Sequence, residues 1–102
     1  MDREPQLTTR IHVRERVASL LSEIAGIPLG SITDSATVDG ELAISSVAFV
    51  QLCVTVEEEY DVEIDPIRVI TLNQFGAIVD YIYNLAVGAE RWEQAARTDG
   101  AS

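Results

Sequence analysis

The chain has 102 residues, 47% of them hydrophobic, which suits one packed domain and leaves little room for a second. Acidic residues outnumber basic ones 17 to 7, and the net charge of −10 disfavours nucleic acid and anionic membranes as partners. There is no lysine, one histidine and one cysteine, so a Schiff-base lysine and a zinc site are excluded.

Other residue patterns narrow the function classes further. No apolar run approaches 18 residues and residues 1–10 hold no apolar stretch, so neither a membrane span nor a signal peptide is expected. Cys53 has no partner for an internal disulfide, and a cytoplasmic location is the expectation. His12 lies among charged residues and is predicted to be a solvated surface residue. Without a Gly-x-Ser-x-Gly elbow, we expect no catalytic residues and no enzyme acting alone.

The first helix is predicted to start after a cap at Thr8 or Thr9 and to end near Ala25, before Gly26. Its apolar residues recur at steps of three and four and mark one buried stripe: Val13, Val17, Leu20, Leu21 and Ile24.

Residues 26–45 read as a long connection because turn-forming and capping residue types dominate them. A structureless loop of that length is unusual in a small domain. Six apolar side chains are therefore predicted to pin it across the helices: Ile27, Leu29, Ile32, Val38, Leu42 and Ile44.

The second helix is predicted to start at Ser45 or Ser46 and to end near Tyr60. It carries two apolar rows, the first formed by Val47, Val50 and Val54 and the second by Phe49, Cys53, Val56 and Tyr60. One helix cannot turn both rows into a small core, so one row should remain partly exposed and offer a partner surface.

After a connection over residues 61–64, Asp65 is predicted to cap a brief helix with Pro66 at its first position. Thr71 or Asn73 is predicted to cap the last helix, which should end at Gly88. Its apolar stripe is Phe75, Ile78, Val79, Ile82, Leu85 and Ala86. The predicted fold is a small all-α four-helix bundle, with three main helices, one short helix and a long loop after the first. The predicted organisation is a flexible N-terminus (1–7), one domain (8–87) and a flexible C-terminal tail (88–102).

Ser45-Ser46-Val47 and the run Glu57-Glu58-Glu59-Tyr60 together carry a family resemblance. Over about residues 11–86 the sequence resembles the acyl and peptidyl carrier proteins, in which an Asp-Ser-Leu-type motif opens the second helix. The resemblance implies that Ser46 carries 4′-phosphopantetheine, whose thiol holds an acyl or aminoacyl group as a thioester. It implies a phosphopantetheinyl transferase and ketosynthase, acyltransferase or adenylation enzymes as partners. We expect a monomer that docks on them through the apolar row Val47, Val50 and Val54 of the second helix, with Glu57 or Glu58 at the rim.

The sequence departs from the family at three positions. Ser45 replaces the aspartate that commonly engages the transferase, while Ala48 and Gln51 stand where fatty-acid carriers often place acids. The departures favour polyketide or nonribosomal peptide pathways over a housekeeping fatty-acid carrier. They leave open an unloaded carrier-like scaffold, and an unrelated acidic helical adaptor is a further alternative. Phe49, one turn beyond Ser46, is either a core residue or a limit on how much acyl chain enters the bundle.

Overall fold

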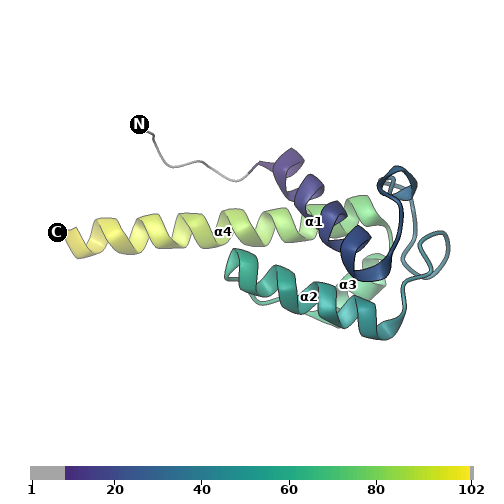
Figure 1. Ribbon diagram of the computed structural model, residues 1–102. Coiled ribbons are helices and arrows are strands. Elements are labelled where there is room, and N and C mark those ends of the chain that lie inside the picture. Colours follow the sequence, from purple (N-terminus) through teal and green to yellow (C-terminus); the bar gives the residue numbers. More distant parts are fainter. Residues whose placement is uncertain (1–8, 102) are drawn as a thin grey trace.

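The computed structural model describes the backbone of residues 9–101 and the side chains of residues 9–88 (Figure 1). Its elements are α1 (Arg10–Ala25), the 3-10 turn η1 (Leu29–Ser31), α2 (Ser46–Tyr60), α3 (Pro66–Leu72) and α4 (Phe75–Ala101). The only β-type pairing in the described chain is an isolated bridge. The predicted all-α bundle, with its short third helix and long first loop, is confirmed. The predicted flexible N-terminus (1–7) lies outside the described residues.

Three helix ends follow directly from local sequence. Thr9 Oγ accepts a hydrogen bond from the His12 amide at 3.2 Å and starts α1, while Gly26 ends it in the left-handed conformation with φ 71°. Asp65 Oδ1 accepts from the Ile67 amide at 3.0 Å, just before Pro66 opens α3. A side-chain oxygen satisfies an amide that has no partner inside the helix, and these predicted caps are confirmed.

The start of α4 differs from the prediction. Thr71 lies inside α3, and Asn73 ends α3 with φ 65° instead of capping α4. The first amides of α4 donate to carbonyls of the long loop: Phe75 N to Ala36 O at 2.9 Å, and Gly76 N to Asp34 O at 2.8 Å. Backbone oxygens from distant sequence thus replace a local side-chain cap, which a local pattern cannot reveal.

The end of α4 also differs, because the helix passes through Gly88 and continues to Ala101. A glycine inside a helix costs only about 1 kcal/mol relative to alanine. The strong helix formers that follow, Ala, Glu, Arg and Gln, offset that cost. The prediction that Gly88 ends the helix is wrong, and the boundary at 87–88 remains a prediction.

The core lies where α1 packs against α4 and α2, and Figure 1 shows α1 crossing α4. It takes its apolar side chains from all four helices and from the loop. Ile32, Val38 and Leu42 are buried as predicted loop anchors, and Ile27 and Ile44 pack against the core while partly buried. Leu29 is 58% exposed, so its assignment as an anchor is wrong. Ala36 is buried instead, beside the point where the loop meets α4.

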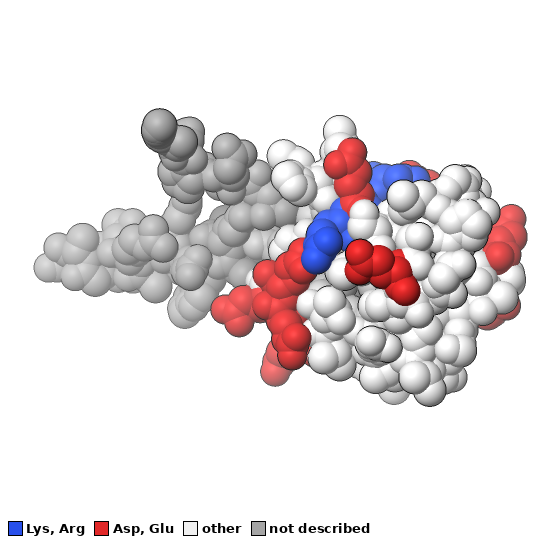
Figure 2. Space-filling view, viewed as in Figure 1, with Lys and Arg blue, Asp and Glu red and all other residues white. Residues whose placement is uncertain are grey.

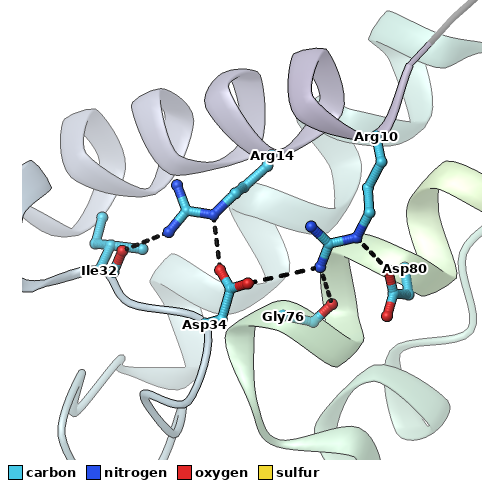
Figure 3. Close-up of polar contacts among 6 residues, drawn as sticks. All are labelled: Arg10, Arg14, Ile32, Asp34, Gly76 and Asp80. Atoms are coloured by element: carbon cyan, nitrogen blue, oxygen red, sulfur yellow. Dashed lines mark hydrogen bonds and ion pairs between the residues drawn. The ribbon is translucent and has the colours of Figure 1, made fainter.

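A polar cluster fixes the start of the loop against α1 and α4 (Figure 3). Asp34 accepts from Arg14 Nε at 2.7 Å and lies 3.8 Å from Arg10 Nη2. Arg10 also pairs with Asp80 and donates to the Gly76 carbonyl at 3.2 Å. The hydrogen bond from Arg14 lowers the pKa of the Asp34 carboxyl. Exposed pairs of this kind contribute roughly 0–1 kcal/mol each, so their main consequence is the path of the loop.

Candidate functional site

Ser46 is the first residue of α2, and its side chain is exposed. Ser45 precedes it as the N-cap: its Oγ accepts from the Ala48 amide at 3.1 Å, and its carbonyl accepts from the Phe49 amide at 2.9 Å. Among the described residues, no protein group is hydrogen-bonded to the Ser46 hydroxyl. Ser45 therefore caps the start of α2, and the hydroxyl of Ser46 is left exposed.

The electrostatics at this helix end suit a phosphate group. The N-terminus of an α-helix carries a partial positive charge from its unpaired amides, and an anion placed there is stabilised. The first turn of α2 contains no acidic side chain that would already occupy this position. An exposed hydroxyl at such a helix end fits a phosphodiester.

The chain leading to Ser46 is held in a fixed path. The Leu42 amide donates to the Thr37 carbonyl at 2.9 Å and the Ile44 amide to the Val38 carbonyl at 3.0 Å. Between them, Ala43 adopts φ 47°, a conformation that costs a residue with a Cβ about 1–2 kcal/mol. The loop therefore enters α2 through a strained residue supported by hydrogen bonds.

Asn73 ties this loop to the junction of α3 and α4. Its Oδ1 accepts from the amides of Val38 at 3.1 Å and Asp39 at 3.3 Å. The sequence pattern did not identify this role, although asparagine is one of the few residue types other than glycine that are enriched at positive φ, as Asn73 has at the end of α3.

A cavity of about 230 Å³ opens beside Ser46, between the loop, α2 and α3. Ser46, Asp39 and Asn73 contribute polar groups to its lining. The apolar part comes in pairs from the three elements: Val38 and Ile44, Phe49 and Val50, and Pro66 and Ile70. We call this space the α2–α3 cavity. The site thus combines an exposed serine hydroxyl with an adjacent apolar space.

The structure leaves one apolar row of α2 exposed, as the sequence predicts. Val47 is 77% exposed, Val50 and Val54 are also exposed, and Phe49, Cys53 and Val56 of the other row are buried. Two exposed residues of α3, Ile67 and Ile70, were not identified from the sequence, because α3 is too short for a periodic pattern. The surface over α2 is largely uncharged in Figure 2, and acidic side chains gather toward the C-terminal end of α2.

The three glutamates at the end of α2 have different environments. The Glu57 carboxylate accepts from the Ile64 amide at 2.8 Å and is half-buried, so it supports the turn after α2. Glu59 binds Arg16 of α1 through both carboxylate oxygens, and this hydrogen bonding lowers the pKa of its carboxyl. Glu58 is exposed and has no ion pair within the described part of the chain. Of the two predicted rim acids, Glu58 is the one available to a partner.

Neither the cysteine nor the histidine adds reactive chemistry at the surface near Ser46. Cys53 is buried, and desolvation raises the pKa of its thiol to about 11. His12 is exposed on α1, as predicted. No helix in the described chain is both long enough and apolar enough to span a membrane.

Comparison with known proteins gives the class of this chain. Residues 15–82, which include Ser46, match the family described as "Phosphopantetheine attachment site". The chain is 33% identical over 73 residues to an acyl carrier protein of Acidothermus cellulolyticus, covering 72% of this chain and 87% of that protein. It is 36% identical over 75 residues to the acyl carrier protein of Tropheryma whipplei (strain Twist), covering 72% and 90%.

This chain therefore belongs to the phosphopantetheine-binding carrier proteins. Its cofactor is covalently attached 4′-phosphopantetheine, and the predictions of family and cofactor are confirmed. When bound, the cofactor supplies a thiol that carries cargo as a thioester.

Proposed function

We propose that Ser46 carries the phosphopantetheine arm and that the protein presents an acyl or aminoacyl thioester to enzymes without catalysing a step itself. The observation that carries the proposal is the exposed Ser46 hydroxyl at the start of α2, next to a serine already committed to capping. A modifying enzyme can reach Ser46 without breaking a hydrogen bond of the helix end. Loading Ser45 would remove a cap worth typically about 1 kcal/mol.

The proposed partners are a phosphopantetheinyl transferase and cargo-loading and processing enzymes of the ketosynthase, acyltransferase or adenylation type. Their docking surface is the exposed row of Val47, Val50 and Val54, with Glu58 at its rim. Apolar contacts at the centre of an interface hold a complex, whereas rim charges mainly steer its formation.

We assign the carrier to a polyketide or nonribosomal peptide pathway. This rests on the charge pattern of α2: the stretch from Ser46 to Val56 contains no charged side chain, although the whole chain has a net charge of −10. Fatty-acid carriers, by resemblance, often place acids in this stretch. A turnover comparison between enzymes of the two pathway classes tests the assignment, and faster turnover with fatty-acid synthesis enzymes would reverse it.

The attachment is tested by incubating the protein with a promiscuous phosphopantetheinyl transferase and coenzyme A. Intact mass should show one added arm, and peptide mapping should place it on Ser46. Ser46→Ala should abolish the adduct, while the matched variant Ser45→Ala should still accept it. An adduct on Ser45 overturns the assignment. Loading of Ser45→Asp but not of the natural protein favours an unloaded scaffold instead.

The docking surface is tested by placing a charge within the exposed row. Val54→Asp should slow turnover with a cognate enzyme while the helical circular dichroism spectrum stays unchanged. Ile11 is a matched control, because it is another large aliphatic side chain exposed on a helix, but it lies on α1. Equal losses in Val54→Asp and Ile11→Asp would show that added charge, and not this surface, is responsible.

A further inference from the structure

We infer that the carboxylate of Asp39 recruits the enzyme that modifies Ser46, by pairing with a cation that this enzyme holds beside its bound coenzyme A. The inference rests on the proposed attachment at Ser46. It names a recognition residue for that reaction, and this residue lies on the long loop, outside the exposed row of α2.

Asp39 is distant from Ser46 in sequence but lies near it in space. Both residues line the α2–α3 cavity, and both are exposed. The Ile44 amide donates to the Val38 carbonyl at 3.0 Å, which brings the two ends of this loop segment together. Asp39 directly follows one of the bonded residues, and Ser46 comes two positions after the other. The fold therefore places a carboxylate beside the same space as the Ser46 hydroxyl.

The backbone of Asp39 is held on two sides. Its amide donates to Asn73 Oδ1 at 3.3 Å, which ties it to the junction of α3 and α4. On the other side, the amides of Thr37 and Glu41 each donate to the other residue's side-chain oxygen at 3.2 Å. Glycine is needed at position 40 of this turn, because a Cβ on Gly40 would collide with Thr37 Oγ1. A carboxylate presented from a fixed backbone loses less entropy when a partner binds it.

The Asp39 carboxylate is available to a partner. Within residues 9–88 it makes no hydrogen bond or ion pair, whereas the Glu41 carboxylate accepts from the Thr37 amide. Among the described residues that line the cavity, Asp39 is the one charged residue. From Ser46 to Val56, α2 offers no charged side chain. Asp39 is therefore the acid that a modifying enzyme meets beside the serine.

The chemistry of the modification determines which charge the enzyme brings. The Ser46 oxygen bonds to the phosphorus next to the pantetheine, the pyrophosphate bond of coenzyme A breaks, adenosine bisphosphate leaves, and the serine proton passes to solvent. An enzyme that binds these phosphates surrounds them with cations, which must then lie close to the start of α2. A carboxylate beside Ser46 pairs with one of these cations, and such a pair speeds association and fixes orientation.

The inference is tested by steady-state loading of the full chain with a promiscuous phosphopantetheinyl transferase and coenzyme A, followed by intact mass. Asp39→Asn should raise the KM for the carrier by roughly five-fold at low salt, the upper end for an exposed ion pair, and leave kcat unchanged. Asp39→Glu should keep the charge and lose little. In 1 M salt, where exposed charges are screened, the natural protein and Asp39→Asn should load alike.

The matched control is Asp61→Asn. Asp61 is exposed at the opposite end of α2, and its substitution removes the same unit of charge. Asparagine also tolerates the left-handed backbone there, φ 55°. This variant should load like the natural protein.

A double variant adds a readout that a purely structural role of Asp39 would not change. Ser45→Asp should speed loading more in the Asp39→Asn background than in the natural protein, because an acid at either position meets the same cation.

Any one of five results would overturn the inference. They are equal or faster loading by Asp39→Asn, an equal loss in Asp61→Asn, an equal loss in Asp39→Glu, a fall in kcat at unchanged KM, and an equal gain from Ser45→Asp in both backgrounds. Each can occur with normal loading at Ser46 of the natural protein, which would leave the proposed function intact. Failure of the natural protein to load would refute the proposed function and this inference with it.

Discussion

Ser45→Asp should stabilise the unloaded protein and speed its modification. The structure separates two contributions at this position. Aspartate caps a helix about as well as serine, so the hydrogen bond now made from the Ala48 amide to Ser45 Oγ should be retained. A negative charge at a helix start adds about 0.3–1 kcal/mol, and the first turn of α2 has no acidic residue. For a domain of this size the melting temperature should rise by about 2–6 °C.

Loading should change the outcome of the same substitution. If the arm is attached as proposed, its phosphodiester on Ser46 places a negative charge beside residue 45, at the same positive end of α2. Two anions that compete for one helix end repel each other, so Ser45→Asp should stabilise the loaded protein less than the unloaded protein. The difference should shrink in 1 M salt, where the screening length falls to about 3 Å.

The measurement is thermal unfolding of both forms of the natural protein, Ser45→Asp and Ser45→Ala, together with loading rates followed by intact mass. Ser45→Ala removes the cap and should cost about 1 kcal/mol, or about 4–8 °C. Ser45→Asp should load faster than the natural protein, because it restores the residue that the family commonly presents to the transferase. An unchanged melting temperature in Ser45→Ala would refute the capping argument, and a loss of stability in unloaded Ser45→Asp would refute the electrostatic one.

Three further outcomes are expected. Ala43→Gly should raise the free energy of unfolding, measured with urea, by roughly 0.5 kcal/mol. The relief of about 1–2 kcal/mol of backbone strain at φ 47° exceeds the roughly 0.4–1 kcal/mol by which glycine stabilises the unfolded chain through its greater conformational entropy. A loss of stability would contradict the strain at Ala43. Hydrogen bonding to Arg14 lowers the pKa of the Asp34 carboxyl below its value in the unfolded chain. The ionised Asp34 therefore stabilises the folded state above about pH 4, and this contribution is lost as the pH falls through the folded pKa. Acid titration of Asp34→Asn should therefore show a weaker loss of stability than that of the natural protein, and identical curves would contradict the pairing. Cys53 is buried and its pKa is about 11, so it should react with a thiol reagent at pH 8 only when the protein unfolds. The folded loaded protein should therefore show one rapidly reacting thiol, that of the arm, and the folded unloaded protein should show none.

Capping residues and the spacing of apolar residues along the sequence predicted most of the bundle. Capping residues such as Thr9 and Asp65 satisfy amides within one helical turn, so their positions can be read from neighbouring residues. The start of α2 and the exposed row through Val47 were predictable for the same reason, since spacing along one helix determines which side chains share a face.

The parts that sequence did not predict depend on contacts between distant segments. The α2–α3 cavity exists only because the loop, α2 and α3 meet. The oxygens that satisfy the start of α4 belong to Asp34 and Ala36, some 40 positions earlier in the chain. The different roles of Glu57 and Glu58 likewise depend on which amide or arginine folds against each one.

The tie between Asn73 and the loop has a consequence for the order of folding. Asn73 lies 35 positions after Val38, so the bond between them forms only once α3 has packed beneath the loop. Contacts that close such long stretches of chain form late, because their loop entropy must be lost first. Ser46 should therefore reach its presented geometry only in the completed fold. A transferase that requires this geometry would discriminate against incomplete chains, and modification would then mark finished carriers.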